Sequence, residues 1–129
     1  MNRRGLTGGF SLIELIVVVA IVSVLLLVAY PRYQSSVDRA EYVALLGNLQ
    51  QFRKTIDHYY EDKGRYPDSL ERLVQENYLR SVPVDPITGS SGTWILMRGT
   101  GIDTSGIVDV RSGAHGVSWS GVPYSELTP

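Results

Sequence analysis

One uninterrupted apolar segment limits what this chain can fold into. Residues Phe10–Tyr30 read FSLIELIVVVAIVSVLLLVAY, and only Ser11, Glu14 and Ser23 among them are clearly polar. About 20 apolar residues in a helix cross the ~30 Å hydrocarbon core of a bilayer. The rest of the chain, about 100 residues, is too small a domain to bury such a helix on every side. The segment therefore predicts a transmembrane helix rather than the core helix of a soluble protein.

The residues before this segment predict its orientation and processing. Residues 1–9 read MNRRGLTGG, and Arg3 and Arg4 favour a cytoplasmic N-terminus because basic flanks stay inside. An ordinary secretory signal has a small-residue cleavage site after its apolar run, but here Gly8 and Gly9 lie before the run. Cleavage after Gly9 would remove the basic leader and leave the apolar helix on the mature protein.

Glu14 is the one charged residue within the apolar segment. A carboxylate in a membrane is costly unless it is paired or close to the interface. Glu14 lies four residues beyond Phe10, so shallow burial near the interface is one interpretation. The other is that cleavage gives Phe10 a free ammonium, which Glu14 of the same or a neighbouring copy neutralises. Such a pair would set the axial register between subunits, because an unpaired charge in an apolar medium is strongly destabilising.

A known family matches this region. Residues 8–34, GGFSLIELIVVVAIVSVLLLVAYPRYQ, resemble the N-terminal cleavage and methylation segment of type IV pilins and type II secretion pseudopilins. The matching features are Gly9 before the cut, Phe10 as first mature residue, Glu14, and Pro31 at the end of the apolar run. The resemblance implies that a prepilin peptidase cuts the Gly9–Phe10 bond and N-methylates Phe10. It also implies a homo-oligomeric helical filament with a core of bundled N-terminal helices.

A helical period continues beyond Pro31. Apolar residues recur at spacings of three and four, which predicts an amphipathic stripe. We expect one long helix, roughly Phe10–Tyr60, kinked near Pro31 because proline lacks the helical donor, and capped by Gly64. The stripe comprises Tyr33, Val37, Ala40, Ala44, Leu45, Leu49, Phe52, Ile56 and Tyr59.

Shorter elements follow the long helix. Asp68 and Glu71 have capping-box spacing and predict the start of a short helix. Proline, glycine and β-branched residues predict the loops and strands after it. The expected elements are a helix over Ser69–Asn77, a loop over Ser81–Gly92, strands over Thr93–Arg98 and Ile107–Arg111 with a turn over Gly99–Gly106 between them, and a largely irregular tail over Ser112–Pro129.

This layout is similar to the G-type major pseudopilins. The similar stretches are GRYPDSLERLV, YLRSVPVDP, WILM and IVDVRSGAHG. The resemblance implies an α+β, type IV pilin-like fold, in which a long N-terminal helix packs on a small head with a short helix and a small antiparallel sheet. One departure follows Asp85-Pro86, where the family commonly has an aromatic residue and glycine but this chain has Ile87-Thr88.

The same resemblance raises calcium binding, because many family members bind it in the C-terminal loop. Asp109 and Glu126 are the best side-chain candidates here, with water and backbone oxygens completing the shell. His115 stands where an aspartate is expected in the family. The alternative is a loop held by hydrogen bonds and by packing of Trp119 and Tyr124.

Composition argues against several other classes of protein. Cysteine is absent, which excludes a disulfide scaffold, a Cys-ligated zinc site and a thiol nucleophile. His58 and His115 are the only histidines, and no G-x-S-x-G, P-loop or Rossmann glycine pattern is present. We therefore expect no catalytic residues. The balance of 12 basic and 13 acidic residues gives no reason to expect a nucleic-acid partner.

These observations predict a structural subunit of a type II secretion pseudopilus that helps to drive protein export. We expect a leader (residues 1–9), a transmembrane and filament-core helix (10–30) and a head that includes the amphipathic half of the long helix (31–129). The subunit would cross the bacterial inner membrane once, with its head in the periplasm, and would become part of a periplasmic filament. Before assembly it would contact lipid, and its protein partners would be prepilin peptidase, minor pseudopilins and the inner-membrane assembly platform.

Two alternatives stay open. The first is a type IV pilus pilin used for adhesion, motility or DNA uptake. Many such pilins close a C-terminal loop with a disulfide, so the absence of cysteine favours a pseudopilin. The second is a monomeric membrane-anchored binding domain, which would leave the basic leader and Glu14 unexplained.

Overall fold

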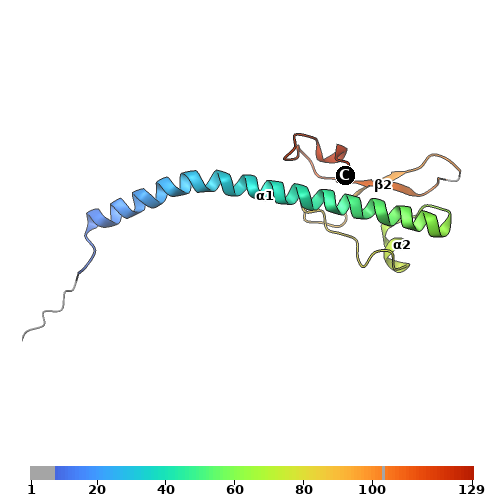
Figure 1. Cartoon of the computed structure of the whole chain (residues 1–129), viewed down its shortest axis with the longest axis horizontal. Coiled ribbons are helices and arrows are strands. Elements are labelled where there is room, and N and C mark those ends of the chain that lie inside the picture. Colours follow the sequence, from blue (N-terminus) through green and yellow to red (C-terminus); the bar gives the residue numbers. More distant parts are fainter. Residues whose placement is uncertain (1–7, 103) are drawn as a thin grey trace, which may run out of the picture. The chain divides into compact units, whose positions relative to one another are not determined.

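The computed structural model describes residues 8–102 and 104–129. In chain order, the described helices and strands are α1 (Leu12–Lys63), α2 (Leu70–Gln75), β1 (Ile95–Arg98), β2 (Ile107–Arg111) and the 3-10 helix η1 (Tyr124–Glu126) (Figure 1). They confirm the predicted α+β fold with a long helix, a short helix and a two-stranded antiparallel sheet. The chain divides into two units, one ending at Ser36 and one spanning Val37–Pro129.

Helix α1 is continuous through Pro31. Proline has no N–H to donate to the carbonyl of Leu27, yet the helical assignment does not break at this position. The kink expected at Pro31 stays a prediction. The C-terminal cap is confirmed, because Gly64 adopts φ +66° and its N–H donates to the Tyr60 carbonyl at 2.8 Å.

The second half of α1 buries one face in the core of the head. The buried residues Leu45, Leu49, Phe52, Ile56 and Tyr59 are predicted by the helical period, whereas buried Thr55 is not. Tyr33, Ala40 and Ala44, predicted for the same stripe, are exposed instead. Ala40 precedes Leu45 by five residues, which at about 100° per residue turns it about 140° away around the helix. The predicted stripe is therefore too wide around the helix at its N-terminal end.

Residues from every other part of the head complete this core. Figure 1 shows the sheet and α2 flanking the second half of α1. The Trp94 ring meets the edge of Phe52 with ring centroids 5.0 Å apart, and its Nε1–H donates to the Pro83 carbonyl at 2.8 Å. The indole thereby buries its apolar body without leaving its donor unpaired. Leu70, Leu73, Leu79, Ile107, Val110 and Leu127 fill the remaining core.

Helix α2 is shorter than predicted, and its cap is a different residue. Ser69, in extended backbone conformation, is the N-cap, and its side chain accepts the N–H of Arg72 at 3.2 Å. The prediction of Asp68 as the cap was therefore wrong by one position. Asn77, predicted to close the helix, adopts φ +64°, a left-handed conformation that asparagine tolerates better than most residues.

Tyrosines connect the end of α1 to the segments around α2. Tyr59 and Tyr78 meet edge to face with ring centroids 5.1 Å apart, and Tyr60 stacks on Tyr66 at 4.6 Å. The Tyr78 hydroxyl donates to Asp62 at 2.7 Å, and this hydrogen bond raises the pKa of Tyr78 to about 12. The contacts hold α2 and its flanking loops against the last turns of α1.

A bulge changes which residues of β2 face the core. Met97 pairs with Asp109 but Arg98 pairs with Ile107, so Val108 is an extra residue in β2. The bulge lets both Ile107 and Val110 point into the core although they are three residues apart. β2 has the predicted bounds, whereas β1 begins two residues later than predicted, at Ile95.

Asp85 is a fully buried carboxylate that joins the loop before β1 to the end of β2. One oxygen accepts the N–H groups of Ile87 at 2.8 Å and Thr88 at 3.4 Å. The other accepts the Ser112 hydroxyl at 2.5 Å, and Ser112 Oγ in turn accepts the N–H of Ala114 at 3.1 Å. Burial of the carboxylate is tolerated because protein donors replace its water.

We predict that Asp85→Ala lowers the free energy of unfolding of the head by about 2–4 kcal/mol, because buried donors lose their acceptor. Urea unfolding of the full chain in detergent micelles, followed by tryptophan fluorescence, measures the change. Asp57→Ala removes an exposed carboxylate on α1 and serves as the matched control. Equal stability of the two variants would contradict a structural role for Asp85.

Candidate functional site

The candidate cleavage site lies directly before α1. Residues 8–11 are not helical, and Phe10 is 87% exposed. A Cβ atom added at Gly9 would meet no atom within 4 Å among the described residues, its two chain neighbours aside. The Gly9–Phe10 bond is therefore accessible, and a need for glycine here would come from the enzyme rather than from the fold. Arg3 and Arg4 of the leader lie outside the described residues.

Ser11 caps the helix that follows, a role that our sequence analysis missed. Its carbonyl accepts the N–H of Leu15 and its hydroxyl accepts the N–H of Glu14, both at 3.2 Å. Ser11 and Glu14 have the spacing of a capping box, and this signal could have identified the helix start. Glu14 thus lies in the first turn, where a negative charge is favourable because of the helix dipole.

Glu14 has no ion-pair partner among residues 8–102 and 104–129. Its side chain is exposed, as is that of Phe10 four residues earlier. In the uncut chain the Phe10 nitrogen is part of a peptide bond and carries no charge. The pairing of Glu14 with a Phe10 ammonium would therefore require cleavage, and it stays a prediction.

The apolar part of α1 is long and apolar enough to cross a membrane, and its most apolar stretch is not covered by any part of the described chain. Ser23 is polar, but its hydroxyl donates to the Val19 carbonyl at 2.7 Å within the helix. Tyr30 ends the apolar stretch and Tyr33 follows it, and tyrosine is enriched at membrane–water interfaces. Ser23 therefore bonds within the helix, and tyrosines lie where the apolar stretch ends.

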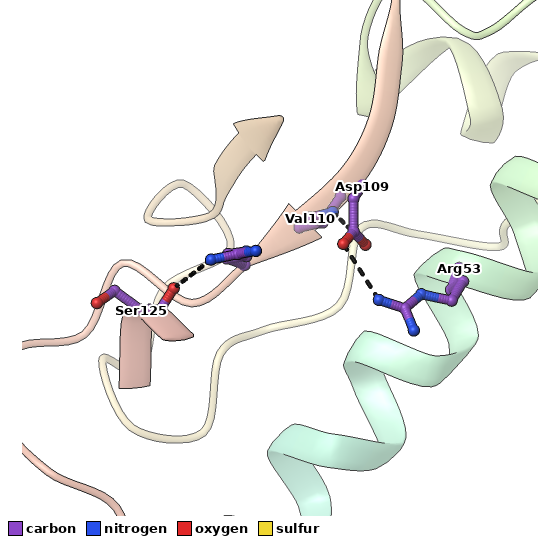
Figure 2. Close-up of polar contacts among 5 residues, drawn as sticks. Arg53, Asp109, Val110 and Ser125 are labelled. Atoms are coloured by element: carbon purple, nitrogen blue, oxygen red, sulfur yellow. Dashed lines mark hydrogen bonds and ion pairs between the residues drawn. The ribbon is translucent and has the colours of Figure 1, made fainter. Parts of the chain in front are cut away.

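The two calcium candidates lie in different settings. The Asp109 carboxylate accepts a hydrogen bond from Arg53 at 3.1 Å, and its other oxygen accepts the N–H of Val110 at 2.9 Å (Figure 2). Glu126 is exposed in η1. Within the described ranges, no three acidic or histidine side chains converge on a possible metal position. Calcium takes about six to eight oxygen ligands, several of them from carboxylates, and its binding by Asp109 and Glu126 stays a prediction.

The described residues also show how the histidines are placed. His58 is exposed on α1, 3.9 Å from Glu61. His115 is exposed in the C-terminal segment. In the described part of the chain, neither histidine belongs to a group of three or more acidic or histidine side chains that could hold a metal ion.

An apolar, capped helix that follows an accessible glycine bond, joined to a small α+β head, defines a pilin-like subunit. Residues 1–30 match the family described as the prokaryotic N-terminal methylation motif. The type II secretion system core protein G of Pseudomonas aeruginosa is 32% identical over 102 residues, which cover 67% of this chain and 71% of that protein. This chain belongs to the type IV pilin and type II secretion pseudopilin superfamily, with similarity to its G-type members.

Two further relatives come from the pilin side of the superfamily. Fimbrial protein EcpC of Eikenella corrodens is 30% identical over 99 residues, which cover 73% of this chain and 65% of that protein. Type IV major pilin protein PilE1 of Neisseria gonorrhoeae is 36% identical over 64 residues, which cover 50% of this chain and 39% of that protein. No solved structure matches the chain significantly. The relatives are structural subunits, and the motif and the apolar helix fit anchoring in the inner membrane.

We predict that Ser11→Ala weakens the first turn of α1, because the Glu14 N–H loses its acceptor. Loss of a serine cap costs about 1 kcal/mol, which corresponds to about fivefold faster amide exchange at the helix start. Hydrogen exchange of the micelle-bound chain, measured by NMR, tests this. Ser23→Ala is the control, since its hydroxyl bonds in mid-helix. Unchanged exchange at Glu14 would contradict the capping role.

Proposed function

We propose that this chain is a structural subunit of a type II secretion pseudopilus. The observation that carries the proposal is the extent of the match to core protein G, which covers 71% of that protein. The match to the pilin PilE1 covers only 39% of its length. The absence of cysteine agrees with this choice, because many type IV pilins close a loop with a disulfide. The function would be mechanical, with no chemical change in the exported protein.

The subunit would reach the filament through the inner membrane. The leader arginines favour a cytoplasmic N-terminus, which would place the head in the periplasm. Prepilin peptidase would cut the Gly9–Phe10 bond and methylate the new amine. Minor pseudopilins and an inner-membrane platform would then act as assembly partners.

The apolar half of α1 explains why assembly needs a specific polar contact. Its exposed apolar side chains would contact lipid before assembly and apolar side chains of other helices within a bundle. Transfer from lipid to the bundle therefore provides little hydrophobic driving force, and packing and polar pairs must select the arrangement. Glu14 is the only charged residue in this half, so its pairing with a Phe10 ammonium would determine the register.

A type IV pilus pilin is the second candidate, because the match to EcpC covers 73% of this chain. In-frame deletion in the source bacterium, with complementation, separates the two functions. We expect exported proteins to accumulate in the periplasm of the deletion strain, while surface pili remain. Loss of pili with normal protein export would support the second candidate instead.

We predict that the chain isolated from membranes begins at N-methylated Phe10, as measured by intact mass and N-terminal sequencing. Gly9→Leu should leave the leader attached, because the bulkier side chain obstructs the peptidase and not the fold. Gly8→Leu adds the same bulk one residue earlier and should still be cut. Mature-length Gly9→Leu protein would refute the assigned cleavage site.

We predict that Glu14→Ala and Glu14→Leu are processed and inserted normally but assemble poorly. Removing one partner of a buried ion pair costs about 3–5 kcal/mol, which is more than about 100-fold in an association constant. Electron microscopy of sheared filaments measures their number and length. Glu61→Ala removes an exposed head carboxylate and is the control. Filaments of wild-type yield and length from both Glu14 variants would show that the pair does not determine assembly.

A further inference from the structure

Five backbone carbonyl groups of the C-terminal segment, residues 112–127, accept hydrogen bonds from N–H groups of the same segment. The Gly116 carbonyl accepts the N–H of Tyr124 at 3.2 Å, and the Val122 carbonyl accepts that of Ser118 at 2.9 Å. Three more carbonyls of the segment, those of Ser118, Pro123 and Tyr124, accept N–H groups of Gly121, Glu126 and Leu127. These five carbonyl oxygens are therefore engaged with donors of the same chain, which leaves them less available as calcium ligands.

Arg111 supplies a positively charged donor to one further carbonyl of the segment, that of Ser125. It extends from β2, and its Nη1 donates to the Ser125 carbonyl at 3.4 Å (Figure 2). A guanidinium is always protonated in proteins, so this charge is present at every physiological pH. Arg111 thus connects the strand to the residue beside Glu126 through a hydrogen bond.

Arg53 supplies a positive charge to Asp109, the acidic residue of β2. Its guanidinium lies 3.1 Å from the Asp109 carboxylate, and the two side chains are 41% and 25% exposed. The pair joins α1 to β2 across 56 positions in the sequence. A carboxylate that already has a cationic partner and a backbone donor gains less from a metal than a free one.

Packing contacts hold the middle and the C-terminal end of the segment. Leu127 is buried in the core of the head. The Trp119 ring lies 5.9 Å from the ring of Tyr42, and the Arg39 guanidinium lies 5.5 Å from the Trp119 ring centre. Tyr124 packs against the core of the head, and burial raises the pKa of its phenol, with Glu41 and Asp38 of α1 adding to this effect. The segment is therefore anchored at its middle and at its C-terminal end.

We propose that the head of this subunit folds and holds its C-terminal segment without a divalent cation, with the guanidinium groups of Arg53 and Arg111 supplying the positive charge at β2 and η1. The proposal concerns the head alone and does not depend on which filament the subunit builds. It replaces the calcium site suggested by family resemblance with a set of internal contacts.

Thermal unfolding of the full chain in detergent micelles tests the cation independence. Near-ultraviolet circular dichroism reports on Trp94 and Trp119 in EDTA, in millimolar CaCl₂ and in millimolar MgCl₂. We expect the same melting temperature in all three solutions and no saturable heat when CaCl₂ is titrated into the EDTA-treated protein. A metal present at about 100 times its Kd would raise the melting temperature of a small domain by about 10 °C or more. A calcium-specific rise or saturable calcium binding would overturn the proposal.

Two variants test the role assigned to the guanidinium groups. Arg53→Gln and Arg111→Gln should lower the melting temperature by the same amount in EDTA and in CaCl₂. Arg111→Gln should also speed amide exchange across residues 116–127, whereas Arg65→Gln, which changes an exposed arginine, should alter neither measurement. If both variants behave like Arg65→Gln, the guanidinium groups do not hold the segment and this part of the proposal is wrong.

Discussion

The first half of α1 carries apolar side chains on all its faces, and no described residue of the chain covers them. A helix is one of the few structures that can exist in this condition, because its backbone groups bond internally and need no water. Ser11 satisfies the donor at the start of the first turn, and Ser23 bonds to the turn before it. The surroundings that the helix requires, lipid or other copies of itself, therefore follow from its side chains alone.

The second half of α1 is buried by the head on one face only. Positions away from this face, such as Ala40 and Ala44, are exposed. The core depends on partners from distant parts of the chain, including Trp94 against Phe52 and Ile107 and Val110 from a bulged strand. A few specific contacts stabilise the structure of this small head. The buried Asp85 carboxylate makes two of them, because it accepts hydrogen bonds from Ile87 and Ser112.

Much of this arrangement could be predicted because it is local. The apolar run, the three-and-four spacing and the glycine at the helix end each act over a few residues, and so α1 and its cap at Gly64 were predictable. The Ser11 cap was predictable too, from its spacing to Glu14. Other features depend on tertiary contacts. The choice of Ser69 over Asp68 as a cap depends on backbone conformation at one residue, and the bulge at Val108 depends on how two strands pair.

The cleavage motif and the calcium candidates differ in the same way, because the first is local in sequence and the second depends on tertiary contacts. Gly9, Phe10 and Glu14 form a short linear motif, which a single sequence can reveal. Asp109 was chosen as a calcium ligand on its type and position, but its partner Arg53 lies 56 residues away on α1. No periodicity or spacing indicates that pair, so it becomes visible only in the fold.

The charges of the chain are satisfied in two different ways. In the head, partly buried carboxylates find partners within the chain: Glu76 lies 2.9 Å from Arg72 and 3.5 Å from Lys63, and Asp109 lies 3.1 Å from Arg53. Glu14 has no such partner among the described residues, and a carboxylate in a membrane is costly unless it is paired or close to the interface. The partly buried charges named in the head are thus paired within a single copy, whereas the pairing of Glu14 with a Phe10 ammonium stays a prediction. Stability of the head and assembly of the filament are on this basis separable properties, which different residues control.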